Sequence, residues 1–246
     1  MSVDRTPLVG RVDVGRAFTA TRRVRWGDAD HRGRLRLDGI ARYLQDVSND
    51  DTRDAGLGLH LPWVVRRTTI DVIAPPVAGE VLTLTSFCGG LGTAWAERRT
   101  TIEGDGGGHV EAASLWVALD RKTNRPTRLS PEFTALYGSA AAGRTIGARL
   151  HHPRPAEDAP SRPWSLRSTD HDGMGHVNNA ATWEPVEDEL DRRGRVAVRA
   201  ELEYPGAIEP HDVVELRSTL VDDELQVWLL VDGVVRASSL VLTTAR

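Results

Sequence analysis

The chain has 246 residues, 40% of them apolar, and acidic side chains outnumber Lys and Arg by 35 to 31. This composition argues against disorder and gives no global basic charge for binding nucleic acid. With one cysteine, Cys88, the chain forms no intrachain disulfide and no cysteine cluster for a metal. No apolar run is long enough for a membrane span, so we expect a soluble, cytoplasmic protein without membrane insertion.

The first half of the sequence predicts one helix followed by four strands. Apolar residues recur at steps of three and four from Leu37 to Val47, as on a helix with one buried face, and the pattern ends near Gly56. Runs rich in Val, Thr, Ile and Trp, separated by turns with Gly or Pro, predict strands over residues 63–75, 80–90, 94–104 and 110–120.

The second half repeats this plan after a segment, residues 139–160, whose Gly, Ala, Pro and charged residues predict a linker. A shorter helical pattern runs through Ala180, Trp183, Val186 and Leu190. Pro185 lies inside it and predicts a late start or a kink. Strands are predicted over residues 195–206, 212–221, 225–231 and 234–244.

Two related segments, RWGDAD from Arg25 and RSTDHD from Arg167, precede the two helices. They align with a constant offset of 142 positions, which pairs Asp30 with Asp172 and Gly33 with Gly175. Self-similarity at this period indicates a duplicated domain. We therefore predict an α+β fold with domains at residues 1–138 and 161–246, each an antiparallel sheet wrapped around a central helix.

The segment SLRSTDHDGMGHVNNAATW resembles the D-x-x-x-H-V-N-N signature of hot-dog thioesterases. RWGDAD, the following helix and the WVVRR strand resemble the N-terminal half of acyl-ACP thioesterases. The resemblance covers residues 18–245 apart from the linker. It implies two tandem hot-dog domains that hydrolyse acyl-ACP or acyl-CoA thioesters to free fatty acid and thiol in fatty acid biosynthesis. It also implies an acyl carrier protein or CoA thioester as partner and no cofactor.

Thioester hydrolysis requires an activated water or a carboxylate nucleophile, and donors aimed at the carbonyl oxygen. Asp172, His176 and Asn178 are therefore the predicted catalytic residues. Asn178 or Asn179 is also placed to cap the second helix, whose first N–H groups could polarise the carbonyl. Four residues are predicted to bind substrate: Asn179, Gln45, Asn49 and Trp183.

The first copy departs from the signature, because Arg34 and Arg36 stand where His176 and Asn178 stand in the second copy. We expect its site to be inactive. The second copy has Met174, Ala207 and Ile208 where plant relatives carry an Asn, an acidic residue and a Cys. Three alternatives follow: a carboxylate elsewhere substitutes, with Glu187, Asp188 and Glu209 as the candidates; Asp172 alone handles the water; or catalysis is weakened.

Two other functions remain open on the same fold: non-catalytic binding of an acyl thioester or acyl carrier, and hydratase or dehydratase chemistry with a His and an acid. His151 and His152 lie in the predicted linker without further ligands, so no metal site is predicted. The fused pair supplies the contact that single hot-dog chains make by dimerising, so we expect a monomer or a homodimer.

Overall fold

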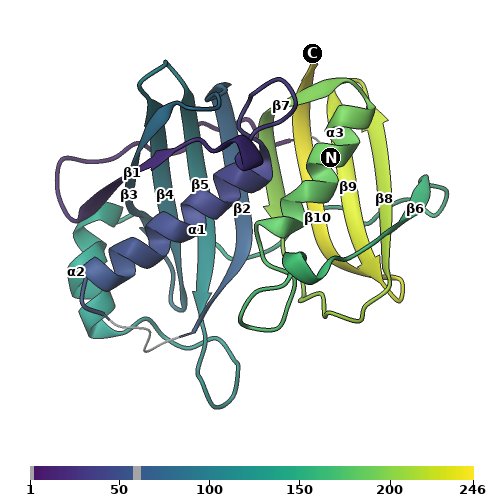
Figure 1. Cartoon of the computed structure of the whole chain (residues 1–246). Coiled ribbons are helices and arrows are strands. Elements are labelled where there is room, and N and C mark those ends of the chain that lie inside the picture. Colours follow the sequence, from purple (N-terminus) through teal and green to yellow (C-terminus); the bar gives the residue numbers. More distant parts are fainter. Residues whose placement is uncertain (1–2, 58–61) are drawn as a thin grey trace.

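The computed structural model describes residues 3–57 and 62–246 (Figure 1). In the first half, α1 (Leu37–Asp54) lies across five strands, and α2 (Pro131–Ala141) packs beside β3. The five strands are β1 (Ala17–Arg23), β2 (Trp63–Ala74), β3 (Val81–Leu91), β4 (Trp95–Gly104) and β5 (His109–Ala118). The predicted helix and four predicted strands are thus confirmed.

The second half repeats the arrangement with a shorter helix. A 3-10 turn, η3 (Ala181–Trp183), leads directly into α3 (Glu184–Arg192). Pro185 falls in the first turn of α3, where no intrahelical donor is required of it, so the predicted late start is correct. The strands are β6 (Ser161–Trp164), β7 (Arg195–Glu203), β8 (Val214–Val221), β9 (Glu224–Val231) and β10 (Val234–Ala245).

All ten strands form one antiparallel sheet in the order β1-β3-β4-β5-β2-β7-β10-β9-β8-β6. The two halves contribute five strands each, in mirrored order, so that β2 and β7 meet in the middle. There Arg67 lies opposite Glu203, and Asp71 lies opposite Arg199. Both α1 and α3 cover the same side of the sheet (Figure 1). This is the predicted α+β class with two tandem hot-dog units.

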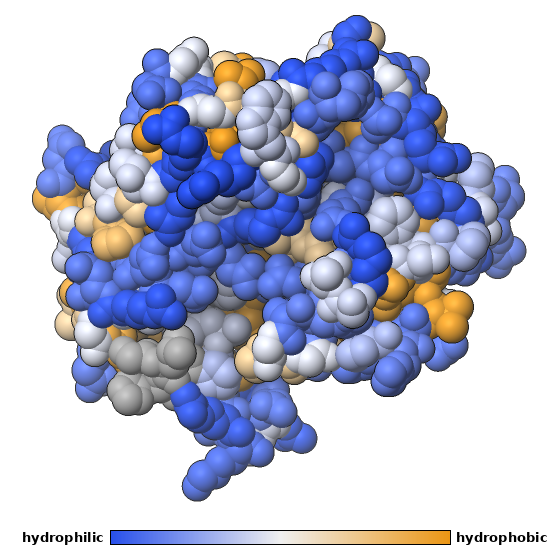
Figure 2. Space-filling view, in the orientation of Figure 1, coloured by the Kyte–Doolittle hydropathy of each residue, from blue (hydrophilic) through white to orange (hydrophobic). Residues whose placement is uncertain are grey.

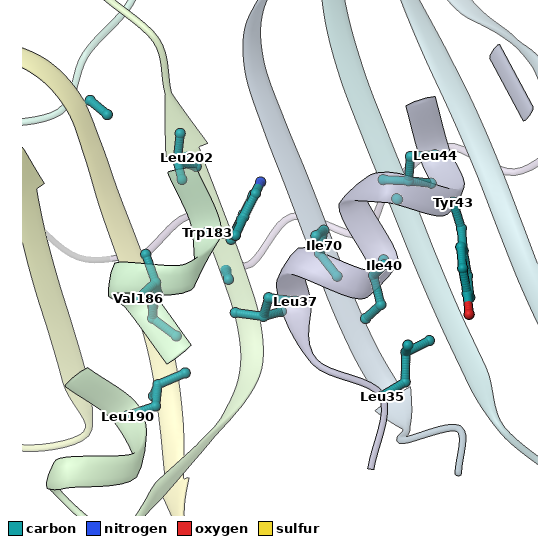
Figure 3. Close-up of a cluster of buried hydrophobic side chains, with 14 of the residues drawn as sticks. Leu35, Leu37, Ile40, Tyr43, Leu44, Ile70, Trp183, Val186, Leu190 and Leu202 are labelled. Atoms are coloured by element: carbon teal, nitrogen blue, oxygen red, sulfur yellow. The ribbon is translucent and has the colours of Figure 1, made fainter. Parts of the chain in front are cut away.

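The core crosses the boundary between the two halves. Ile40 and Leu37 of α1 belong to the same buried cluster as Trp183 and Leu202 of the second half. Figure 3 shows Leu37 reaching from α1 toward Trp183 and Val186. Burial of each such side chain stabilises the fold by about 1.5–3 kcal/mol, so the halves are held by shared apolar contacts as well as by the sheet.

Helix α2 was not predicted, and it extends to Ala141, inside the predicted linker. Its start has a clear local cause: Ser130 accepts a hydrogen bond from the Phe133 N–H at 3.1 Å, and Pro131 follows it. Its buried face is short and consists of Tyr137, Ala140 and Ala141, so it gave no long apolar period to find. The proposed domain bounds of 1–138, 139–160 and 161–246 remain a prediction.

Figure 2 shows a largely hydrophilic surface on the side that carries α1 and α3, with apolar residues in separate small patches. None of the helices in the described part of the chain is long and apolar enough to cross a membrane.

Candidate active site

The turn that precedes η3 in the second half has the same backbone conformation as the turn that precedes α1 in the first half. The Asp172 N–H donates to the carbonyl oxygen of His176 at 3.0 Å, and the Asp30 N–H donates to that of Arg34 at 2.7 Å. Each turn closes on a glycine in the left-handed region, Gly33 at φ 83° and Gly175 at φ 82°. The sequence repeat is therefore a structural repeat, and the backbone fixes where the Asp172 carboxylate stands.

The two aspartates differ in what their second carboxylate oxygen contacts. Oδ1 of Asp172 accepts the Met174 N–H at 2.8 Å, while Oδ2 accepts only a long bond from Asn178 Nδ2 at 3.3 Å. In the first copy, Oδ2 of Asp30 is ion-paired with Arg34 at 2.9 Å. Among the residues that the structure describes, no cationic side chain pairs with Asp172. Its carboxylate is thus the less neutralised of the two.

His176 lies beside an acidic residue that the sequence offered as one of three substitutes. Its Nε2 is 3.2 Å from Oε1 of Glu209, and both side chains are about half exposed, at 44% and 55%. The Val177 N–H donates to the Ile208 carbonyl at 2.9 Å, which holds the two segments together. Glu209 therefore lies two residues after Ala207, the position of the missing acidic residue.

The other two candidate carboxylates are engaged elsewhere. Glu187 accepts the Leu37 N–H at 2.6 Å, and Asp188 is ion-paired with Arg162. Glu187 follows Asn179 by eight residues, which corresponds to roughly 12 Å along a helix. Neither carboxylate contacts the turn that holds Asp172.

Asn178 begins the helical segment, as predicted for one of the two asparagines. Its Oδ1 accepts the Ala180 N–H at 2.8 Å, and its carbonyl oxygen accepts the Thr182 N–H at 3.2 Å. The same side chain reaches back to Asp172 through Nδ2. Asn178 thus links the carboxylate to the start of the helical segment, where N–H groups point away from the helix.

A small cavity adjoins this start, and both halves of the chain line it. Asn179 and Tyr204 come from the second half, and Gln45, Thr68 and Trp116 come from the first. Two predicted substrate-binding residues, Asn179 and Gln45, therefore meet in one cavity.

Trp183 and Asn49 occupy different places. Trp183 is fully buried and donates from Nε1 to the Tyr204 hydroxyl at 3.0 Å, so it stands behind the cavity wall. The Tyr204 hydroxyl in turn donates to the Asn179 carbonyl at 3.1 Å. Asn49 lies one helical turn beyond Gln45 on α1 and is exposed, away from the residues that line the cavity.

The first copy has its own cavity at the other end of the helix pair. It is lined by Asp30, Arg34, Arg36 and Glu187, among others. Arg36 is ion-paired with Asp38, and Arg34 with Asp30. These arginines replace the groups that the second copy has as His176 and Asn178, which supports an inactive first copy.

Sequence reasoning missed Tyr204 and Thr68 as cavity residues, and for Trp116 it favoured core packing over a place in the wall of an acyl tunnel. Tyr204 ends the strand pattern ELEY, and Trp116 alternates within β5, so both resembled ordinary sheet residues. Their place in the cavity depends on pairing across the two halves, which no local pattern encodes. Trp116 Nε1 is buried without a hydrogen-bond partner in the described structure, so the cavity wall carries an unused donor.

Comparisons with known proteins give one family. A family model described as the acyl-ACP thioesterase N-terminal domain matches residues 15–137. Two uncharacterized proteins from Mycobacterium tuberculosis strains are each 34% identical to the chain over 236 residues, covering 95% of this chain and 94% of theirs.

Solved structures show the same fold over nearly the whole chain. A putative oleoyl thioesterase from Lactobacillus plantarum aligns with a TM-score of 0.80 at 20% identity, covering 95% of this chain and 98% of that one. The 12:0-ACP thioesterase from Umbellularia californica aligns with a TM-score of 0.77 at 18% identity, covering 94% and 98%. Together with the family model, the fold and the duplicated turn lead to one conclusion: the chain belongs to the acyl-ACP thioesterase family and is a thioester hydrolase.

Proposed function

We propose that this chain hydrolyses acyl-ACP thioesters in fatty acid biosynthesis at the turn that holds Asp172. The observation that carries the proposal is that three features border one helix start along the chain. These are a carboxylate with no cationic partner among the described residues, a His–Glu pair, and a cavity built by both halves of the chain.

Asp172 is the proposed base. Its Oδ2 has one long bond, from Asn178, so this oxygen is the one best able to take a proton from water. The water oxygen then attacks the thioester carbonyl carbon, and N–H groups at the start of the helical segment stabilise the charge on the carbonyl oxygen. The C–S bond then breaks, and the leaving thiolate takes up a proton to become the free thiol.

His176 is proposed to position and polarise the thioester. Glu209 lies at Nε2 of the imidazole, which leaves Nδ1 for the substrate. A carboxylate beside a histidine orients the ring. The pair also offers a proton source for the departing sulfur.

The acyl chain is proposed to enter the cavity beside Asn179 and Gln45. Leu44, Val65 and Trp116 give this cavity an apolar lining for the hydrocarbon. Since Asn178 touches Asp172 and Asn179 follows it directly, a chain in this cavity would bring its thioester to the carboxylate.

The test is thiol release from acyl-ACP and acyl-CoA substrates of graded chain length, with wild type, His176→Ala and Glu209→Gln. We expect His176→Ala to lower kcat/KM at least tenfold, about 1.4 kcal/mol of barrier, and Glu209→Gln to lower it less. Asp188→Asn is the matched control, because this carboxylate on α3 pairs with Arg162, away from the turn.

An unchanged rate in His176→Ala would refute the assignment of this residue. Binding of acyl-ACP with no hydrolysis above background by the wild type would overturn the proposed activity. Faster turnover of acyl-CoA than of acyl-ACP at every chain length would overturn the choice of carrier.

A further inference from the structure

The linker crosses the outer face of the sheet where the two halves join. Ala200 and Leu202 of β7 belong to the core beneath the helices, so strand alternation places Glu201 and Glu203 on the opposite face. The carboxylate of Glu203 accepts two backbone N–H groups from the linker, from His151 at 2.8 Å and from His152 at 3.1 Å. The linker is thus fixed onto β7, next to β2.

Further contacts hold the same segment on both sides of β7. Arg67 of β2 reaches the Arg149 carbonyl at 3.4 Å, and the Trp228 indole N–H of β9 donates to the Pro153 carbonyl at 2.8 Å. Because Arg67 and Trp228 lie on strands from different halves, residues 149–153 span the junction. The two histidines sit at the centre of this crossing.

Both imidazoles converge on one carboxylate oxygen. Nε2 of His151 and Nε2 of His152 each lie 3.1 Å from Oε1 of Glu201. One ligand atom from each of these three residues and from Glu203 can be chosen so that all lie within 4.8 Å of one another. Nitrogen and oxygen ligands on a tetrahedral ion, at bond lengths of 2.0–2.1 Å, stand about 3.3 Å apart. The two Nε2–Oε1 separations of 3.1 Å are close to that spacing.

The outer nitrogens of the two rings already have partners. Nδ1 of His152 lies 3.1 Å from the carbonyl oxygen and 3.0 Å from the hydroxyl oxygen of Ser238, so an N–H on this nitrogen has an acceptor. In that tautomer the Nε2 lone pair is available to an ion. Nδ1 of His151 lies 3.3 Å from Oε1 of Glu203 and 3.3 Å from Nη1 of Arg67. A carbonyl or carboxylate behind a ligating imidazole is the support that metal-binding histidines have.

Glu201 is held as the remaining ligand. Its other oxygen, Oε2, accepts the Thr69 hydroxyl at 2.8 Å and lies 3.8 Å from Nε of Arg67. Its Oε1 faces the two imidazoles.

We propose that His151, His152 and Glu201, supported by Glu203, bind a divalent cation of the zinc class. Two imidazoles and a carboxylate are a common ligand set for Zn²⁺, with a fourth position for Glu203 or water. The ion lies between the nitrogen and oxygen lone pairs of these side chains. Without it, protons would have to separate those lone pairs. It fastens the linker to β7 beside the junction, on the face opposite the acyl cavity, so its role is structural.

The experiment uses the full chain, freed of metal with a chelator and titrated with Zn²⁺ against a chromophoric competitor. We expect one equivalent to bind, with at least tenfold weaker binding in His152→Ala and in Glu201→Gln. Co²⁺ in place of Zn²⁺ is expected to give visible absorption bands of a tetrahedral site with nitrogen and oxygen ligands. Zn²⁺ is also expected to raise the Tm of the wild type and of no ligand variant.

His109→Ala is the matched control. Its Nε2 lies 3.3 Å from Glu111, but that pair has no second imidazole, so the variant should bind Zn²⁺ as the wild type does. His151→Ala replaces a side chain that is 40% exposed, and it provides a second ligand variant if His152→Ala does not fold. No stoichiometric binding by the wild type, or equal affinity in wild type and His151→Ala, would overturn the proposal and leave protons as the occupants.

Discussion

Glu187 gives the sharpest prediction about the stability of the fold. This side chain on α3 accepts the Leu37 N–H at the start of α1, and α1 has no side-chain cap of its own there. Burial between the helices, with Asp38 nearby, raises the pKa of Glu187 to about 7 from an ordinary value of 4.5. The residue 142 positions earlier, in the first copy, is Gln45, so Glu187→Gln is a change that the duplicated site already accepts.

The direction in which pH changes the stability follows from the raised pKa of Glu187. Below pH 4.5 the carboxyl is protonated in both folded and unfolded chains, and its contribution to stability is fully present. As the pH rises toward 7, only the unfolded chain ionises, so that contribution is lost, at about 1.4 kcal/mol per pH unit. The resulting loss of folding free energy is about 1 kcal/mol at pH 5 and about 3 kcal/mol at pH 8.

Glu187→Gln removes this cost and keeps an oxygen for the Leu37 N–H. The free energy of unfolding in urea is measured for the variant and the wild type at pH 5 and pH 8. We expect the excess of the variant over the wild type to be about 2 kcal/mol larger at pH 8 than at pH 5. Asp188→Asn, at the next position on α3 and half exposed, is the control and should show no such difference. A difference between wild type and Glu187→Gln that is the same at both pH values would refute the reasoning.

Three further changes test a buried ion-pair cluster of the first half and the residues of the cavity. Asp51 is 1% exposed and binds Arg98 and the Tyr137 hydroxyl. Asp51→Asn should therefore lower the free energy of unfolding in urea by about 3–5 kcal/mol, and a loss below about 1 kcal/mol would contradict this. Tyr204→Phe removes an acceptor for Trp183 and should cost about 1–3 kcal/mol by the same measurement, while an unchanged midpoint would contradict it. Trp116→Leu enlarges the cavity and should move the kcat/KM optimum to longer acyl chains, by up to about fourfold per added methylene; an optimum at the same length would count against this cavity.

Much of the fold followed from local patterns. The period of three and four residues in α1 and the alternation in the strands each reflect one buried face. Both can therefore be recognised in a single sequence. The duplication was visible because the turns at Asp30 and Asp172 must keep the same backbone, including a glycine with positive φ. Helix α2 was missed, since its capping signal at Ser130 is short and its buried face is small.

The site was predicted in part. The residues from Asp172 to Asn179 are consecutive, and one turn brings them together, so the sequence itself carries their grouping. Glu209 and Tyr204 come from other segments, and their placement depends on the pairing of distant chain segments. The same holds for Glu201 beside His151, which no sequence spacing connects to the linker.

The central claim is that the second copy of the turn is catalytic and the first is not. The most direct measurement compares kcat/KM for acyl-ACP hydrolysis in Asp172→Asn and Asp30→Asn, two changes at equivalent positions with the same backbone bonds. We predict a loss of at least tenfold in Asp172→Asn and wild-type activity in folded Asp30→Asn. Equal rates in the two variants, or a larger loss in Asp30→Asn, would contradict the account.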